Sequence, residues 1–553
     1  MTARRRSSTS DRIAEAAREY GWEQLRPGQR EAVEAVLAGH DVLAVMPTGH
    51  GKSAIYQLAA KLVDGLTVVV SPLIALQRDQ VEQLEGLGAD AAVAVNSSQR
   101  VGETREAWEE LEAGEAEFVF LAPEQLARDE VLARLRELEP SLLVVDEAHC
   151  VSAWGHDFRP EYLRLGHVVD ALGHPTTVAL TATAAPPVRE EIVERLRMRD
   201  ARQVVRGFDR PNIFLEVQRH SGDDEKREAI VARAVAEAKP GLVYVATRKD
   251  AERYAAELIA AGVRAESYHA GMPRAERERV HATFSDGTAE VVAATSAFGM
   301  GIDKADVRFV LHAAPPDSLD SYYQEIGRSG RDGEPALAAL FHRQEDFGLH
   351  RFRTGGSADV DMLSAVASRV RRAKAPVPPE RLRERLDVGA SRLTAAVNLL
   401  EQAGAVETTD DGELVWREGT VKPAVEEAAR IAEARRRVDR SRVEMMRGYA
   451  ETSGCRRRFL LGYFGEELPG LCGACDTCRS GSAARAEAER EAADASADAA
   501  GEWSVGMRVR HEAWGEGGVV SDDGDRITVL FDEEGYKTLA LEVVARSGVL
   551  QPL

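Results

Sequence analysis

A lysine in a glycine-bearing loop is the first residue whose surroundings predict chemistry. The apolar run 41–45 leads into Met46–Ser53, which reads Met-Pro-Thr-Gly-His-Gly-Lys-Ser, and a helix-forming stretch follows at 54–62. A strand, such a loop and a helix form a phosphate-binding loop: Lys52 reaches the β- and γ-phosphates, and the Ser53 hydroxyl ligates Mg²⁺. Met46 stands where the usual pattern begins with glycine. The predicted nucleotide ligands of the loop are Thr48, Gly49, Gly51, Lys52 and Ser53.

A pair of carboxylates argues against a chance match of this loop. Ser141–Val145 is a second apolar run, and Asp146 and Glu147 follow it directly. An aspartate at the end of such a strand holds Mg²⁺ together with Ser53, and the next glutamate polarises the attacking water. The alternative is a solvated strand end. Beside the intact loop, the pair predicts an ATPase whose catalytic residues include Lys52, Asp146 and Glu147.

Two residues upstream of the loop are candidates for base recognition. A glutamine amide can bond the N6 and N7 edge of adenine, and an aromatic ring can stack on the base. Gln29 and Trp22 are therefore predicted to bind the adenine of ATP. The alternative is an ordinary helix cap and a core tryptophan.

A third set of residues lies far downstream, in the string Tyr322–Gly333. Arg328 and Arg331 are three residues apart, and on a short helix they would face the same way. At a cleft between two domains, such arginines can bond the γ-phosphate as it leaves, as arginine fingers do. The alternative is an arginine-rich solvated helix.

Four of the five cysteines cluster near the C-terminus, separated by sixteen, two and two residues. Thiolates at this spacing can complete a closed tetrahedral Zn²⁺ site, which is structural because no position is left for water. A redox pair or an iron cluster is the alternative. Cys150 stands apart and is expected to be an unligated core thiol. The predicted zinc ligands are Cys455, Cys472, Cys475 and Cys478.

Size and composition restrict the class of protein. A chain of 553 residues is too long for one core and suits three or four domains. It has no run of 18 apolar residues and no apolar signal core near its start, so we expect a cytoplasmic protein without a membrane partner. The net charge of −21 does not exclude nucleic acid, because phosphate contacts need only a local basic track.

The order of these motifs resembles superfamily 2 helicases, and specifically the RecQ family. Leu25–Gln29 is similar to its adenine-reading motif, which adds Arg26 to the predicted ATP ligands. Asp146–Cys150 is similar to its acidic box. The resemblance implies two RecA-like parallel-sheet motor domains, Arg331 as the stronger finger with Arg328 as its companion, and Gln324 positioning the water. The cysteine spacing also resembles the zinc module of this family.

An aromatic stretch after the acidic box strengthens the resemblance. Val151–Tyr162 looks like the family's loop that couples strand binding to ATP hydrolysis. Aromatic rings there can stack on bases, and the basic side chains can meet phosphate or the carboxylates beside ATP. Ordinary packing is the alternative. Another apolar run ends in paired threonines. The residues predicted for DNA binding and coupling are Trp154, His156, Phe158, Arg159, Thr181 and Thr183.

The C-terminal half departs from the family pattern. Val360–Val421 stands ahead of the zinc cysteines and reads like a displaced winged helix, with Ser391 capping a helix and Asp411-Gly412 turning a hairpin. Val505–Leu550 reads like a small Tudor-like β-barrel, with turns at Gly515–Gly517 and Asp522–Gly524. This tail is expected to dock a protein or nucleic acid, or else to be a stabilising cap.

These elements predict an α/β chain in six segments. The predicted segments are a first motor domain at 1–210, a second at 211–355, a winged-helix-like insertion at 356–422, a helical zinc module at 423–480, a linker at 481–501 and the barrel at 502–553.

The resemblance implies a 3′→5′ DNA helicase or translocase in repair and recombination, with ATP, Mg²⁺ and Zn²⁺ as cofactors and single-stranded and duplex DNA as partners. An RNA helicase shares the motor motifs, but the aromatic loop and the zinc spacing disfavour it. A non-hydrolysing DNA-binding scaffold is the third hypothesis. The intact Lys52, Asp146, Glu147, Arg328 and Arg331 speak against it.

Overall fold

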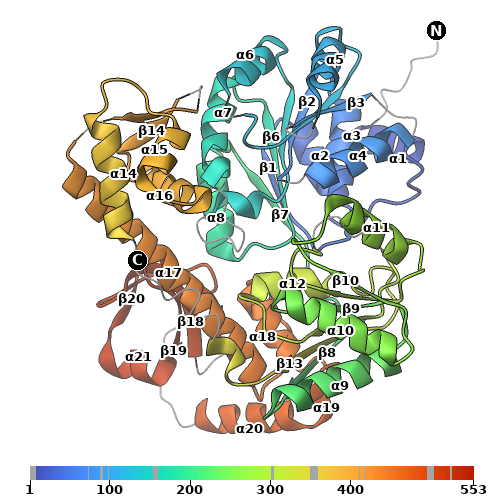
Figure 1. The fold of residues 1–553 in the computed structure, drawn as a ribbon. Coiled ribbons are helices and arrows are strands. Elements are labelled where there is room, and N and C mark those ends of the chain that lie inside the picture. Colours follow the sequence, from blue (N-terminus) through green and yellow to red (C-terminus); the bar gives the residue numbers. More distant parts are fainter. Residues whose placement is uncertain are drawn as a thin grey trace.

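A computed structural model gives the fold of the chain (Figure 1). The structure describes residues 8–72, 74–86, 91–96, 99–126, 128–152, 160–299, 304–348, 359–409, 412–417, 419–494, 503–522 and 526–553. Among the helices described, none is long and apolar enough to cross a membrane.

The first body is a seven-stranded parallel sheet with the order β3-β4-β2-β5-β6-β1-β7. Most of its strands are buried along their whole length, as expected for a parallel sheet covered by helices on both faces (Figure 1). Its strands are β1 (Val42–Val45), β2 (Thr67–Val70), β3 (Ala92–Val95), β4 (Phe118–Leu121), β5 (Leu142–Val145), β6 (Thr176–Thr181) and β7 (Arg202–Val205). Its helices are α1 (Thr9–Glu19), α2 (Gln29–Leu37), α3 (Ser53–Leu62), α4 (Ile74–Gly86), α5 (Val101–Glu112), α6 (Asp129–Glu137), α7 (Leu165–Ala171) and α8 (Pro186–Arg195), with short 3₁₀ turns η1 (Ala148–Val151) and η2 (Pro160–Arg164).

The second body is a six-stranded parallel sheet with the order β10-β11-β9-β12-β13-β8. It lies below the first body in Figure 1. Its strands are β8 (Ile213–Arg219), β9 (Gly241–Tyr244), β10 (Ala265–Tyr268), β11 (Val291–Ala294), β12 (Phe309–His312) and β13 (Ala336–His342). Its helices are α9 (Asp223–Ala236), α10 (Arg248–Ala260), α11 (Arg274–Ser285) and α12 (Leu319–Ile326). The two sheets confirm the predicted α/β class.

A three-helix unit with a hairpin follows the second body. Leu393, Val397 and Leu400 are all buried in its small core, as their spacing predicts. Its helix α16 begins at Ala390 after Gly389, so the prediction that Ser391 caps this helix is wrong: the chain turns two residues earlier. Asp411 lies outside the described residues. The elements are α14 (Val360–Arg372), α15 (Pro379–Leu386), α16 (Ala390–Gln402), β14 (Val406–Thr408) and β15 (Leu414–Trp416).

A long helix, α17 (Val421–Glu451), connects this unit to the cysteine-bearing region. It crosses the lower left of the molecule in Figure 1. The region continues with α18 (Arg456–Tyr463), α19 (Asp476–Arg479) and α20 (Ser482–Asp494). The segment predicted to be a linker is thus helical over much of its length.

The chain ends in a five-stranded antiparallel sheet with the order β19-β18-β17-β16-β20. The predicted turn at Gly515–Gly517 is wrong: Gly515 begins a strand, and the turn precedes it. Part of the second predicted turn, Asp522–Gly524, lies outside the described residues. The elements are β16 (Arg508–His511), β17 (Gly515–Asp522), β18 (Arg526–Phe531), β19 (Gly535–Ala540), α21 (Leu541–Ser547) and β20 (Leu550–Pro552).

Candidate functional site

The predicted phosphate loop lies between the end of β1 and the start of α3. Gly49 and Gly51 both have left-handed backbone conformations, with φ of 80° and 69°. A Cβ at Gly51 would lie 2.8 Å from the Gln29 amide nitrogen, so a side chain would not fit there. Lys52 Nζ donates to the Met46 carbonyl at 3.2 Å, within the same loop. Burial lowers the pKa of Lys52, whereas the charges of Glu147 and Asp146 act in the opposite direction.

Residues ahead of the loop hold it from one side. The Gln29 amide nitrogen donates to the carbonyls of His50 and Gly51 at 3.0 and 2.8 Å, and its oxygen accepts from the backbone N–H of Arg26 at 2.7 Å. The Arg26 guanidinium donates to the Gly49 carbonyl. Trp22 is half-buried and stacks on Tyr20, with ring centroids 5.1 Å apart. Arg26 and Gln29 therefore lie next to the phosphate loop, and Gln29 fixes its conformation.

The carboxylate pair lies at the end of β5. Asp146 accepts from the backbone N–H of Glu147 at 3.0 Å, and Glu147 itself has a left-handed φ of 48°. Burial and then the charge of Glu147 raise the pKa of Asp146 to about 7. A divalent cation would stabilise the ionised carboxylate, so these residues fit the predicted Mg²⁺.

A chain of polar contacts runs from Glu147 to the end of β6. His149 Nδ1 lies 3.4 Å from a Glu147 carboxylate oxygen and 3.0 Å from the Thr181 hydroxyl. That hydroxyl donates to the Thr183 carbonyl at 3.0 Å and accepts from the Thr183 N–H at 3.2 Å. Both threonines are buried. The structure thus brings Thr181 and Thr183 to the carboxylate pair through His149.

The arginines of the second body lie in a turn and not on a helix. Helix α12 ends at Ile326, so the prediction that Arg328 and Arg331 share a helix face is wrong: the chain turns at Gly327. Arg331 nevertheless reaches the phosphate loop, because a Cβ at Gly49 would lie 3.0 Å from the Arg331 Cδ.

The other two predicted residues of this region lie near that turn. Arg328 is buried, and its guanidinium lies close to Gly299. Burial raises the pKa of Tyr244, and the charge of Arg328 acts against that rise. Gln324 is half-buried on α12. Both residues therefore belong to the same end of the second sheet as Arg331.

The residue that holds this turn was missed by sequence reasoning. Arg210 lies between the two sheets and donates to the carbonyls of Ser329 and Gly330 at 2.9 and 2.8 Å. Asn212 donates to the same Gly330 carbonyl at 2.8 Å. The only signal was a polar Arg-Pro-Asn triplet between two predicted domains. Arg210 also affects the phosphate loop: burial, followed by the charges of Arg26, Arg210 and Lys52, lowers the pKa of His50 to about 4. The site is thus rich in positive charge, as a triphosphate site requires.

The four clustered cysteines converge behind the second body. Their sulfur atoms all lie within 4.8 Å of one another, and those of Cys472 and Cys478 are 3.8 Å apart. Four sulfurs at about 2.3 Å from a tetrahedral zinc are about 3.8 Å apart, so the cluster fits Zn²⁺. Asp476, next to Cys475, accepts from the Val217 N–H at 3.0 Å and from Arg456 at 2.6 Å. The first contact attaches the cluster to β8, and the second attaches it to α18.

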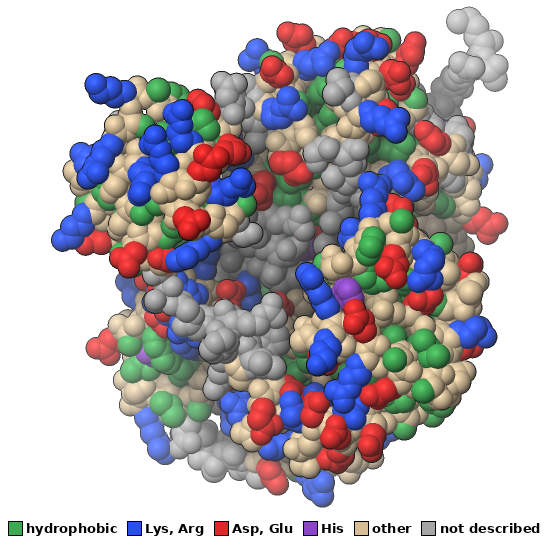
Figure 2. Space-filling model, viewed as in Figure 1, with side chains coloured by type: hydrophobic (Ala, Val, Ile, Leu, Met, Phe, Trp, Pro, Cys, Tyr) green, Lys and Arg blue, Asp and Glu red, His purple; other side chains and the backbone are tan. Residues whose placement is uncertain are grey.

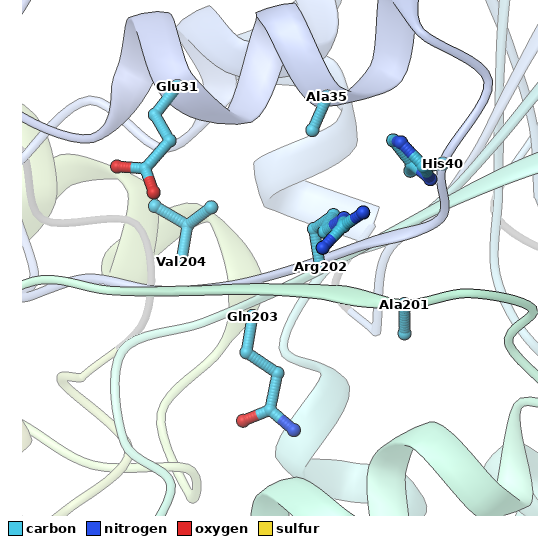
Figure 3. A pocket seen from close by; sticks show the side chains of 7 residues that line it. All are labelled: Glu31, Ala35, His40, Ala201, Arg202, Gln203 and Val204. Atoms are coloured by element: carbon cyan, nitrogen blue, oxygen red, sulfur yellow. The ribbon is translucent and has the colours of Figure 1, made fainter.

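Some predicted residues cannot be placed. The aromatic loop residues Trp154, His156, Phe158 and Arg159 lie outside the described residues. A separate pocket of about 590 Å³ lies between α2 and β7 (Figure 3). It is lined by residues such as Glu31, His40 and Arg202, while Gln203 points to the other side of the strand. Because none of the predicted site residues lines it, this pocket does not mark the nucleotide site.

Comparison with protein families divides the chain in the same way. The family described as DEAD/DEAH box helicase matches residues 26–192, and the helicase conserved C-terminal domain matches residues 225–333. The RecQ zinc-binding family matches residues 420–479, which identifies the four-cysteine cluster as a zinc site.

Individual relatives with similar sequences are named as ATP-dependent DNA helicases. The chain is 34% identical to the ATP-dependent DNA helicase RecQ of Bacillus subtilis over 475 residues, which are 86% of this chain and 67% of that protein. It is 39% identical to the probable ATP-dependent DNA helicase RecS of Bacillus subtilis, covering 60% of this chain and 66% of that one. The identity to the ATP-dependent DNA helicase RecQ of Pasteurella multocida is 40%, over 60% of this chain and 52% of that protein. The chain thus spans about half to two thirds of the length of these relatives.

A solved structure supports the fold alone. The DUF1998 helicase MrfA bound to DNA is 18% identical, with a TM-score of 0.52, over 76% of this chain and 61% of that one. Taken with the sequence relatives and the zinc module, the two parallel-sheet bodies place the chain in the RecQ family of ATP-dependent DNA helicases.

Proposed function

We propose that the chain hydrolyses ATP between its two parallel-sheet bodies and uses the energy to unwind duplex DNA. The observation that carries this proposal is the contact of Arg331, from the second body, with Gly49 of the phosphate loop in the first. A group that completes the site from another body links hydrolysis to relative movement of the two bodies.

Each residue has a role in this proposal. Lys52 binds the β- and γ-phosphates, Ser53 and Asp146 hold Mg²⁺, and Glu147 orients the attacking water. Arg331, with Arg328 behind it, stabilises the charge on the leaving phosphate, and Gln324 helps to position the water. Bound Mg²⁺ supplies neutralisation of the phosphate charge. The buried position of Asp146 beside Glu147 suits this role.

Coupling to DNA would pass through His149. Its Nδ1 atom lies near both a Glu147 carboxylate oxygen and the Thr181 hydroxyl, at the strand end that precedes Thr183. A strand bound near these threonines, and by Trp154, His156, Phe158 and Arg159, can shift the carboxylate that orients water. The same chain of contacts would transmit hydrolysis back to the DNA.

Two finer assignments rest on the resemblance to RecQ proteins: 3′→5′ translocation along one strand, and a role in repair and recombination. Two others rest on the sequence pattern: action in the cytoplasm, and the division of the chain at residues 210, 355, 422, 480 and 501. The relatives are named as DNA helicases, which favours DNA over RNA as the substrate class.

The decisive experiment compares Lys52→Ala with Lys61→Ala. Lys61 lies on helix α3, which begins directly after Lys52, and its side chain pairs with Glu19. ATP hydrolysis is measured with and without single-stranded DNA, and unwinding with DNA and RNA duplexes that carry 3′ or 5′ tails. We expect strong stimulation by DNA, unwinding from 3′ tails, and loss of hydrolysis by about 100-fold or more only in Lys52→Ala. Normal hydrolysis in Lys52→Ala would overturn the assignment. Equal unwinding of RNA and DNA duplexes would favour the hypothesis of an RNA helicase.

A further inference from the structure

A half-buried arginine of the first body reaches the zinc module. Arg189 lies on α8, and its Nε atom donates to the Ala184 carbonyl at 2.9 Å. Its Nη2 atom donates to the Phe464 carbonyl at 2.8 Å. Phe464 directly follows α18 of the zinc module, and Ala184 directly follows Thr183. One side chain therefore joins this module to Thr181 and Thr183, which we call the coupling threonines.

Buried aromatic rings surround the zinc-module end of this contact. The Phe464 ring stacks on Phe208, which lies in the connection between β7 and β8, with centroids 4.5 Å apart. The ring of Tyr323 on α12 lies 4.9 Å from that of Phe464, and its hydroxyl donates to the Phe208 carbonyl at 2.8 Å. The Arg189 guanidinium lies over the Phe208 ring, 5.9 Å from its centroid. Arg189 thus contacts the connection between the two bodies and, through it, α12.

The zinc module is attached to the second body. Arg457 of α18 donates to the Ile213 carbonyl at the start of β8, at 2.5 Å. The Asp476 carboxylate accepts from the Val217 N–H, farther along the same strand. The module therefore follows any movement of the second body relative to the first. Because Arg189 belongs to the first body, its bond to the module crosses the boundary between two parts that move.

The segment that precedes Arg189 is stiff. Pro186 and Pro187 occupy the first turn of α8, where the proline ring fixes φ. The backbone N–H of Arg189 donates to the Ala185 carbonyl at 3.1 Å, so its side chain projects from a formed helical turn. A pull on the guanidinium is therefore passed through Ala184 to the coupling threonines and is not absorbed by the chain.

The Arg189 guanidinium carries its charge at neutral pH. Burial lowers the pKa of Arg189 to about 10, and the charge of Glu466 acts in the opposite direction. Both of its hydrogen bonds are therefore charge-assisted, which makes them stronger than bonds between neutral groups. Glu466 also accepts from the Phe208 N–H. The same carboxylate thus binds the connection between the bodies and favours the charged form of the arginine.

We propose that Arg189 is a positioning residue that transmits the movement of the second body and the zinc module to the coupling threonines, and so links each hydrolysis of ATP to movement along DNA. It acts through these threonines and not by contact with ATP. The inference rests on the proposed function, because it assumes that hydrolysis drives unwinding.

The test uses two substitutions of Arg189. Arg189→Gln removes the charge, whereas Arg189→Lys keeps the charge but has one ammonium in place of the two donor atoms that meet the two carbonyls. The control is Arg136→Gln, at an exposed arginine on α6 with the same change of charge. Lys, Arg, Asp and Glu side chains are mixed over the face shown in Figure 2, so the loss of one exposed charge changes the surface little.

The quantity measured is the number of ATP molecules hydrolysed for each base pair unwound, which we call the coupling ratio. Phosphate release and strand separation are recorded together on a duplex with a 3′ tail. We expect both Arg189 variants to raise the coupling ratio by at least about threefold, and the control to match the wild type. A fraction of unfolded protein lowers both rates equally and leaves their ratio unchanged, so a purely structural role would not produce this rise. DNA-stimulated hydrolysis without any unwinding would be the extreme form of the expected result.

Other results separate this inference from the proposed function. A wild-type coupling ratio in both Arg189 variants would overturn the role of Arg189 alone, and so would full restoration by Arg189→Lys, because charge would then suffice. Loss of both hydrolysis and unwinding in a folded variant would also overturn it, since Arg189 would then be needed for hydrolysis itself. A wild-type protein that neither hydrolyses ATP in response to DNA nor unwinds it would instead overturn the proposed function.

Discussion

Gln29 illustrates how much a residue's role depends on its contacts. Its type and position predict recognition of adenine, yet its amide nitrogen and oxygen already bond three backbone groups of the loop and its approach. Bidentate recognition of adenine needs both a donor and an acceptor. The contacts instead indicate that Gln29 sets the shape of the phosphate loop for any nucleotide.

We therefore expect Gln29→Ala to raise the KM for ATP and for GTP by similar factors, at least about tenfold each, because the variant lacks three hydrogen bonds of about 1 kcal/mol each. Steady-state hydrolysis with each nucleotide measures this. Gln203→Ala, at an exposed glutamine on β7, is the control and should change neither value. A rise in KM confined to ATP would contradict this role and favour direct reading of adenine.

At the scale of elements, the zinc module contacts the helix that leads to the arginines. The hydroxyls of Tyr322 on α12 and Tyr449 on α17 are 3.1 Å apart. Tyr463 on α18 donates to Asp320 at the start of α12. Burial raises the pKa of Tyr322, Tyr449 and Tyr463, so these hydroxyls keep their protons. The zinc site thus helps to hold α12, and through it the turn that carries Arg331.

Removal of one hydroxyl tests this connection. We expect Tyr449→Phe to lower kcat for ATP hydrolysis several-fold with little change in KM, and to lower the free energy of unfolding by about 1 kcal/mol. Tyr254→Phe, on α10, is the control. Zinc content should be unchanged in both variants. A change in stability without any change in kcat would mean that Tyr449 has only a structural role.

At the scale of the whole molecule, the C-terminal sheet is part of the main body. A single hydrophobic cluster includes residues of both parallel sheets, α17, α18 and the C-terminal sheet, among them Val520, Leu530 and Tyr536. The Tyr536 N–H donates to the Ser441 hydroxyl of α17 at 2.9 Å, and Arg430 pairs with Glu533 at 3.1 Å. Of the two roles predicted for the C-terminal sheet, these contacts favour a stabilising cap over a docking surface for the face that packs on α17.

Two glycines allow a matched test of this docking. Gly535 and Gly548 have left-handed φ values of 74° and 64°, so alanine adds similar backbone strain at both. A Cβ at Gly535 would lie 2.3 Å from the Ser441 hydroxyl, whereas one at Gly548 meets nothing within 4 Å. We expect Gly535→Ala to lower the free energy of unfolding by about 2 kcal/mol more than Gly548→Ala. Equal effects in chemical denaturation would show that the sheet is not tightly docked.

The sequence by itself determined the parts that depend on local pattern. Buried strands of a parallel sheet are short apolar runs, and a phosphate loop needs its glycines and Lys52 within a few residues, so β1, β5 and the loop were predictable. The zinc cysteines were predictable for the same reason, because their close spacing along one short segment limits the ways in which their sulfur atoms can surround a metal ion. The apolar spacing also predicted which residues of α16 are buried, although it did not predict where the helix begins.

Only the tertiary structure decided which distant groups meet. The contact of Arg331 with Gly49, the hold of Arg210 on the Gly330 carbonyl and the docking of Tyr536 on Ser441 join segments that are about a hundred or more residues apart. Such contacts depend on how whole elements pack, and no local pattern encodes that packing. Arg328 and Arg331 show the same limit: their spacing suggested a helix, but the chain turns at Gly327, and packing of the two bodies brings Arg331 to the loop.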